Sequence, residues 1–244
     1  MNLLHEAFSW LTTADAWGGS DGLGRAVVDH LSIVAVTFLV SAAVGVPAGV
    51  LIGHTGRGRV VGVVLANAAR ALPTLGLVTL FALGLGIGIV APVVALTVLA
   101  VPPLLAGVYS GIENVDREAV QAARAVGFTQ RQVITQVELP LALPVILGGA
   151  RSAVLQIVAT ATVAAYVWPH GLGAPILSGL ALSDYPRVLG ASVVVIVLAV
   201  VLDVLLAGLQ RLLTPRAMRP ARARGRQRAR DHAPVADLAP DRVG

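Results

Sequence analysis

The sequence predicts an all-α membrane protein with about five transmembrane helices. Hydrophobic residues make up 56% of its 244 residues and charged residues only 13%, about half the charged fraction of a soluble domain. The mean hydropathy is +0.82. Because a soluble fold would leave much of this apolar material in contact with water, a polytopic membrane protein is the first hypothesis.

Five apolar segments are long enough to cross the hydrocarbon core of a bilayer. Residues 31–53 contain no charge, and about 23 helical residues rise about 34 Å, more than the roughly 30 Å that is needed. The apolar run 60–110 is too long for one helix, and its glycines and Pro92 indicate a turn near residues 84–92. Pro73 is a candidate kink. The predicted spans are 31–53, 60–83, 90–110, 145–168 and 188–210.

Polar segments precede and separate these spans. Residues 1–30 contain four acidic residues and one Arg. We expect an extracytoplasmic segment there, in which Trp10 and Trp17 suit either a short interfacial helix or a partly ordered terminus. Residues 169–187 are rich in Gly, Pro and Ser and are expected to include a short re-entrant or interfacial helix. The transmembrane domain is therefore expected at residues 31–213.

The Arg residues predict the orientation of the chain. All 18 basic residues are Arg; with a cytoplasmic C-terminus, fourteen fall on the inner side and two, Arg25 and Arg187, on the outer side. This bias follows the positive-inside rule, so the N-terminus is expected outside and residues 111–144 in the cytoplasm. The tail 214–244 holds eight Arg and three Asp. We expect it to be a disordered cytoplasmic segment that meets membrane lipid rather than nucleic acid.

The residue types that are missing exclude several kinds of site. The chain has no Cys and no Lys, which removes thiolate catalysis, Cys-based zinc sites and the Lys of a phosphate-binding Walker loop. The five His residues show no metal-ligand spacing. Aromatic residues total 4%, too few for a high-affinity cage around a quaternary ammonium group. We therefore expect no catalytic residue, no metal site and no cofactor in this chain.

Residues 114–140 form the most informative segment, NVDREAVQAARAVGFTQRQVITQVELP. Asp116 is a good N-cap for a short helix, and Glu118 in the first turn complements the helix dipole. Gly127 is the expected stop of this helix, where a left-handed residue is needed. Three alanines give the helix a thin surface that can enter a groove on another protein: Ala119, Ala122 and Ala123.

A second short helix is predicted after this stop. Thr129 and Gln132 have the spacing of a capping box. Pro140 and Pro144 are expected to end the helix before the next span begins. Composition alone also fits an ordinary loop helix between two spans.

The order of residues in this segment resembles the EAA loop of ABC-importer permeases. The matching positions are Ala122, Ala123, Gly127, Val137, Leu139 and Pro140, with Gln121 where the family has Glu and Val137 where it has Ile. The resemblance implies a coupling helix that docks in a cleft on a cytoplasmic ABC ATPase and transmits nucleotide-driven closure to the spans. It implies ATPase contacts for Glu118, Ala119, Gln121, Ala122, Ala123, Gly127, Leu139 and Pro140.

The resemblance extends over about residues 30–215, where the sequence is similar to the osmoprotectant branch of these permeases. Four stretches carry it: ARALPTLGLVTLFALGLGIG, VELPLALPVILGGAR, ATATVAAYV and LLAGLQRLLTPR. It implies a MetI-like permease fold in the bacterial cytoplasmic membrane and import of glycine betaine, choline, carnitine or a similar solute.

The same resemblance implies three protein partners. They are a separate ABC ATPase that binds ATP and Mg, an extracytoplasmic substrate-binding protein, and a second permease subunit, identical or related, across a two-fold axis. A permease for methionine or another polar amino acid would have the same loop and remains an alternative.

The predicted span 145–168 carries three polar side chains at four-residue spacing, Ser152, Gln156 and Thr160. This spacing places them on one helix face. Polar side chains in a membrane tend to face a bundle interior or a water-filled path. These three residues therefore either line a translocation route or hydrogen-bond to neighbouring helices.

Three ionisable residues lie at or near membrane depth: Arg70, Arg151 and Asp203. Each is costly there unless it is paired or reaches the interface. We expect structural roles for them, with a gating role as the alternative, and Asp203 is a candidate to pair with an Arg near the inner side.

Two other classes of function remain open. A passive channel would need neither an ATPase nor a docking loop. An intramembrane hydrolase would need a nucleophile with an acid or base partner, but no His falls within a predicted span and the sequence offers no clear Ser–Asp pair.

Overall fold

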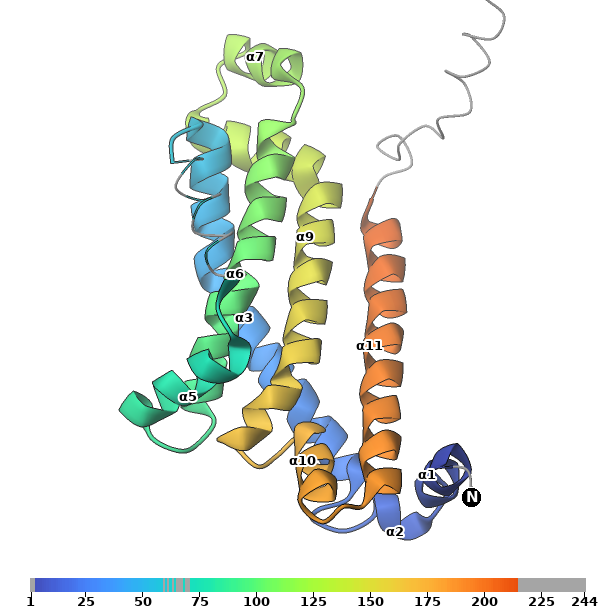
Figure 1. The fold of residues 1–244 in the computed structure, drawn as a ribbon. Helices are drawn as coiled ribbons and strands as arrows, with labels where there is room; N and C mark the ends of the chain where they lie inside the picture. The colour runs from blue at the N-terminus through green and yellow to red at the C-terminus, as the bar shows by residue number, and fades with distance from the viewer. Residues whose placement is uncertain are drawn as a thin grey trace, which may run out of the picture.

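The computed structural model describes residues 3–58 and 71–214, together with residues 60, 62, 64 and 68. The described residues are helical and include no strand, as the sequence predicts (Figure 1). The elements are α1 (Leu3–Leu11), α2 (Ala14–Trp17), α3 (Leu23–Thr55), α5 (Thr74–Leu85), α6 (Val90–Glu113), α7 (Arg117–Ala125), α8 (Gln130–Gln132), the π-helical segment η1 (Val133–Glu138), α9 (Leu139–Thr160), the 3-10 segment η2 (Ala161–Tyr166), α10 (Gly173–Ala181) and α11 (Tyr185–Leu213).

Four helical stretches are long and apolar enough to cross a membrane: α3, α6, the continuous run Gln130–Tyr166, and α11. Three of them begin before the predicted spans. The first starts at Leu23 rather than at residue 31 and extends over 33 residues. Its first turns carry Arg25 and Asp29, an ion pair one turn apart. These charges hid the helix from a search for uncharged runs, although such a pair stabilises a helix.

The predicted span 60–83 is not one continuous helix among the described residues. The helix is interrupted at Leu72 and Pro73, and α5 begins at Thr74. Proline has no backbone N–H and disfavours a helical residue before it, which explains the break. The twelve residues of α5 rise only about 18 Å, less than the roughly 30 Å of a bilayer core. Arg70 and most of residues 60–70 lie outside the described residues.

The turn between α5 and α6 lies where the glycines predict it. Gly86 follows the last residue of α5 with a φ of 85°, and Gly88 has a φ of 147°. Both values lie in the region that L side chains rarely adopt. The short helix expected between residues 169 and 187 is present as α10.

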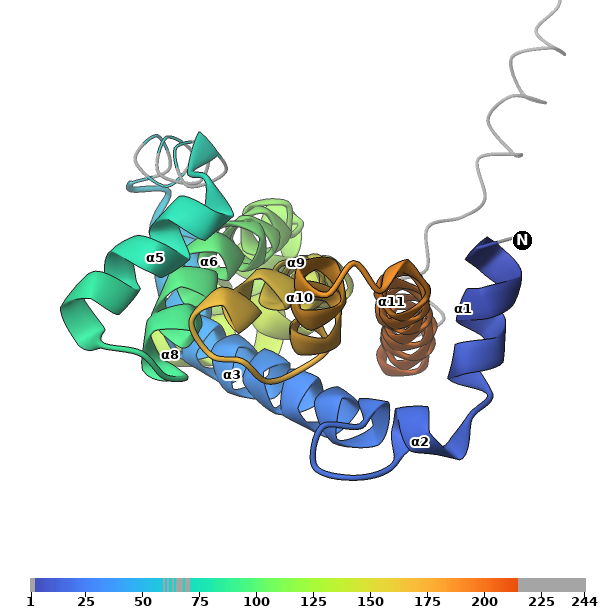
Figure 2. The same cartoon turned by 60° about the horizontal axis from the view of Figure 1, so that its bottom comes forward.

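The core is formed by α3, α6 and α9, which pack side by side (Figure 1). Small and aliphatic side chains fill the space between them, among them Ile33 of α3, Leu96 of α6 and Ile157 of α9. Seen from the end of the bundle, α5 and α11 lie on opposite sides of this core (Figure 2). The outer face of α11 is almost entirely exposed apolar side chain, as expected for a helix that faces lipid.

Glycines bring the backbones of these helices close together. A Cβ added to Gly107 of α6 would lie 2.5 Å from the Cα of Gly149 on α9. On the other side of α6, a Cβ on Gly49 of α3 would lie 2.6 Å from Cβ of Val108. Close approach over small residues is a usual way for transmembrane helices to associate.

The two ends of the bundle differ. Helix α7 lies at the end where α3 and α11 finish, whereas α1, α2 and α10 gather at the opposite end (Figure 1). The N-terminal helix is held there by α11, because Trp10 packs against Gly190. Residues 114–140 and the N-terminal segment therefore lie at opposite ends of the molecule.

Candidate functional site

Helix α7 has the caps that its sequence predicts. The Asp116 side chain accepts a hydrogen bond from the Glu118 N–H at 2.9 Å. At the other end Gly127 has a φ of 91°, its N–H donates to the Arg124 carbonyl, and the Phe128 N–H donates to the Ala123 carbonyl. These two bonds form a Schellman motif. The helix is therefore fixed at both ends by local chemistry.

The helix stands outside the bundle and exposes most of the residues that the resemblance assigns to docking (Figure 1). Ala123 is the exception on α7, because only 8% of it is exposed and it faces the protein. Leu139 is half-buried and packs into the hydrophobic cluster below α7. The exposed members of the set are Glu118, Gln121, Ala122, Gly127 and Pro140, and Ala119 is half-buried.

The helix after α7 begins as predicted but does not end as predicted. Thr129 and Gln132 form the capping box: the Thr129 N–H donates to Gln132 Oε1 at 2.8 Å, and the Gln132 N–H donates to Thr129 Oγ1 at 3.4 Å. The prediction that Pro140 and Pro144 end this helix is wrong, because the helix continues to Thr160.

The π-helical turn η1 explains how the helix passes through Pro140. This residue lacks an N–H donor, and its ring would clash with the carbonyl four residues earlier in a regular α-helix. A π-helical turn is wider, and η1 ends directly before the first turn of α9, in which Pro140 stands. Helix α8, η1 and α9 consequently form one uninterrupted rod.

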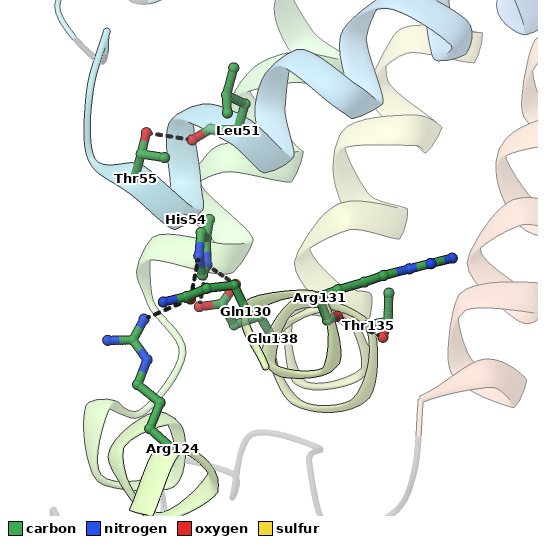
Figure 3. A network of polar contacts seen from close by, with 8 residues as sticks. All are labelled: Leu51, His54, Thr55, Arg124, Gln130, Arg131, Thr135 and Glu138. Carbon is green, nitrogen blue, oxygen red and sulfur yellow. Dashed lines mark hydrogen bonds and ion pairs between the residues drawn. The ribbon is translucent and has the colours of Figure 1, made fainter. Parts of the chain in front are cut away.

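A network of polar contacts joins this rod to the end of α3 (Figure 3). In the last turn of α3, His54 donates through Nδ1 to the Glu138 carboxylate at 2.7 Å. Its Nε2 lies 3.1 Å from Oε1 of Gln130, and Arg124 of α7 approaches the same oxygen at 3.5 Å. The network therefore links α7, α8, η1 and α3. Sequence reasoning did not identify it, since its partners are far apart in the chain.

A cavity of about 440 Å³ lies further along α9. Two of the three predicted path residues, Ser152 and Gln156, line it together with Leu72, Thr74, Leu99 and Pro103. The third, Thr160, is not among the lining residues, and its hydroxyl donates to the Gln156 carbonyl of its own helix at 2.7 Å. The structure thus brings together two of the three residues.

Two polar contacts connect α9 to α11. Arg151 donates to both oxygens of Asp203, each at 2.6 Å, which confirms the expected pairing of Asp203 with an Arg. One heptad away on each helix, Gln210 donates to the Pro144 carbonyl at 2.8 Å. The two contacts align because the helices run in opposite directions.

Histidine also occurs within the first long helix, contrary to expectation. His30 is fully buried in α3, and its Nε2 lies 3.1 Å from the Val158 carbonyl of α9. The predicted boundary at residue 31 excluded it. In the part of the chain that the structure describes, no group of three or more His, Cys, Asp or Glu residues could hold a metal ion.

Comparison with known proteins identifies the family. Residues 45–219 match the family described as "Binding-protein-dependent transport system inner membrane component". The chain is 35% identical over 192 residues to the choline transport system permease protein OpuBB of Bacillus subtilis, covering 78% of this chain and 88% of that one. It is 33% identical to the osmoprotectant import permease protein OsmW of Salmonella typhimurium, covering 81% and 94%.

A solved structure shares the fold. The match is to the inward-facing MetNI methionine ABC transporter, with a TM-score of 0.69 over 79% of this chain and 96% of that one, at 24% identity. The chain therefore belongs to the binding-protein-dependent inner membrane components, the multi-pass, non-catalytic permease subunits of ABC importers, whose ATP is hydrolysed by a separate subunit.

Proposed function

We propose that this chain is the permease subunit of an ATP-driven importer of osmoprotectants such as glycine betaine, choline or carnitine. The observation that carries the proposal is the identity of 33% to 35% over about four fifths of the chain to permeases named for choline and osmoprotectant import. A further relative at 34% is the glycine betaine/carnitine/choline permease OpuCB of Bacillus subtilis. The likeness to the methionine transporter supports the fold alone, because only 24% of the aligned residues are identical.

Helix α7 is the proposed contact with the ATPase. Its exposed face has small side chains around Ala122, and the caps at Asp116 and Gly127 hold it as a rigid unit. A displacement of α7 passes into α9 through the continuous helix that begins at Gln130. This helix carries Ser152 and Gln156 along the cavity, so movement at the cytosolic end changes the proposed solute path.

The proposed arrangement in the membrane follows from the same features. The end with α7 faces the cytoplasm, and the end with α1 and α10 faces outward, where the binding protein delivers solute. The segment that ends with α5 provides a fifth crossing, and a second permease subunit closes the cavity beside Ser152 and Gln156. The tail 214–244 lies on the cytoplasmic side next to anionic lipid.

The test is uptake by the complete transporter in a bacterial strain that lacks its own osmoprotectant importers. The permease is produced with its ATPase and binding protein, and uptake of labelled glycine betaine, choline, carnitine and methionine is measured. We expect uptake of at least one of the first three and recovery of growth in high salt. Uptake of methionine alone would refute the proposed solute class, and uptake without the ATPase would refute the importer mechanism.

A further inference from the structure

The end of α3 has no short chain connection to the coupling helix. Helix α7 is joined directly to α6 on one side and to α8 on the other. His54 is separated from Gln130 by 76 positions and from Glu138 by 84. In the part of the chain that the structure describes, the side-chain hydrogen bonds between α3 and residues 114–138 all involve His54.

The contact between His54 and Glu138 is shielded from solvent. Its side chain is 14% exposed and that of Glu138 only 7%. Screening by water and salt is weaker for such a pair than for a surface pair. The two Glu138 oxygens lie 2.7 and 2.9 Å from Nδ1, so the carboxylate holds the imidazole from one side while Gln130 meets it from the other (Figure 3).

We propose that His54 is a positioning residue that makes α3 move together with the coupling helix during transport. The inference rests on the proposed docking of α7 to the ATPase. A displacement of α7 reaches Gln130 through Arg124 and the short Val126–Phe128 turn. His54 then carries the displacement into α3, the helix that packs along α6 and α9. Without His54, the displacement of α7 reaches α3 only through the packing of α3 against α6 and α9, and ATP hydrolysis moves less solute.

The test compares solute import with ATP hydrolysis in the same proteoliposomes, which contain the complete transporter with its ATPase and binding protein. Glycine betaine is the solute. We expect His54→Ala to lower the glycine betaine imported per ATP hydrolysed by about fivefold or more, the range of typical coupling between sites. The matched control is Thr55→Val, because the hydrogen bonds of the adjacent exposed hydroxyl, to the Leu51 carbonyl and from the Arg57 N–H, stay within α3 and the turn that follows it. An unchanged ratio in His54→Ala overturns the proposal.

Two further variants decide the question if His54→Ala fails to assemble. Glu138→Gln keeps an acceptor oxygen for Nδ1, and His54→Gln keeps a side chain that can hydrogen-bond to Glu138. Both are expected to assemble with the ATPase and to give import ratios between those of wild type and of an uncoupled transporter. Ratios equal to wild type in both variants would overturn the proposal.

A distance measurement tests the movement itself. Because the chain has no Cys, cysteines introduced at the exposed Arg57 and Arg117 can carry a pair of spin labels. In the wild type we expect the same label distance with and without ATP, because the end of α3 follows α7. In a His54 variant that assembles we expect the distance to change with ATP. If the variant behaves like the wild type, His54 does not carry the movement.

Failure of this inference can be distinguished from failure of the proposed docking. If α7 does not dock, Gly127→Val and His54→Ala both leave the import ratio unchanged. If α7 docks but His54 does not carry the movement, only Gly127→Val lowers the ratio.

Discussion

The contact between Gly107 and Gly149 gives a quantitative test of the helix packing. Adding a single methyl group in Gly107→Ala places a Cβ 2.5 Å from the Gly149 Cα. Adding one in Gly149→Ala places a Cβ 2.7 Å from the Gly107 Cα. Ordinary contact begins at 3.4 Å. The atom opposite is backbone rather than a flexible side chain, so the helices themselves must move apart by about 0.9 Å, which forfeits part of the dispersion attraction on both sides.

The expected cost is that of overpacking a closely packed interior, about 1–3 kcal/mol. Part of it is offset, because Ala is favoured over Gly in a helix by about 1 kcal/mol. Gly208→Ala is the matched control: it makes the same chemical change in the long helix α11, where an added Cβ meets nothing within 4 Å. The two variants therefore share the propensity gain, and the difference between them isolates the steric term.

The assay is thermal unfolding of the purified permease in lipid nanodiscs, followed by tryptophan fluorescence. We expect Gly107→Ala to unfold several degrees below Gly208→Ala, since about 1 kcal/mol shifts the Tm of a domain of this size by about 2–4 °C. Equal Tm values for the two variants would show that α6 and α9 do not approach at this point, and the argument for a glycine-mediated crossing would fail.

Three further predictions concern the functional elements. Asp203→Asn removes the charge opposite Arg151 and is expected to lower the Tm of the nanodisc-embedded protein. The double variant Arg151→Asp, Asp203→Arg is expected to recover part of the loss. A Tm equal to wild type in Asp203→Asn contradicts a structural role for the pair. Gln156→Leu is expected to change the KM or maximal rate of uptake at normal expression, and unchanged kinetics remove this residue from the solute path. Gly127→Val and Glu118→Arg are each expected to abolish ATP-driven uptake while the protein still inserts and folds, so retained uptake in both contradicts docking through α7.

Helix α7 could be predicted from sequence in detail because its determinants are local. Asp116, Gly127 and the Thr129–Gln132 pair act within four residues of themselves, and each adopts the structure that its chemistry favours. The same holds for the Gly-rich turn before α6. The membrane class followed from composition, because a soluble fold would leave many of the apolar residues in contact with water.

Other features depend on contacts between residues that are distant in the chain, so they could not be predicted from the local sequence. Pro140 predicted a helix end, but a π-helical turn accommodates the ring, and nothing local in the sequence announces that turn. The partners of His54 lie far away in the chain. The approach of Gly49 to Val108 did leave a signal, because Gly45, Gly49 and Gly53 recur at four-residue spacing, the pattern of close helix packing.

A single helical rod leads from the turn after α7 to the cavity, and its properties constrain how force could pass between the proposed docking helix and the proposed solute path. An α-helix without Pro resists bending, so the stretch from Val145 to Gln156 transmits displacement to the cavity with little loss. Helices bend preferentially at π-helical turns and prolines, and here both occur together at η1 and Pro140. Glu138, the last residue of η1, is also the residue that His54 holds. The contact between His54 and Glu138 therefore joins α3 to the rod at the point where the rod bends most easily. With this contact intact, we expect a push on α7 to carry α3, α9 and the cavity wall together. Without it, part of the same push is lost by bending at η1, and less of it reaches α3.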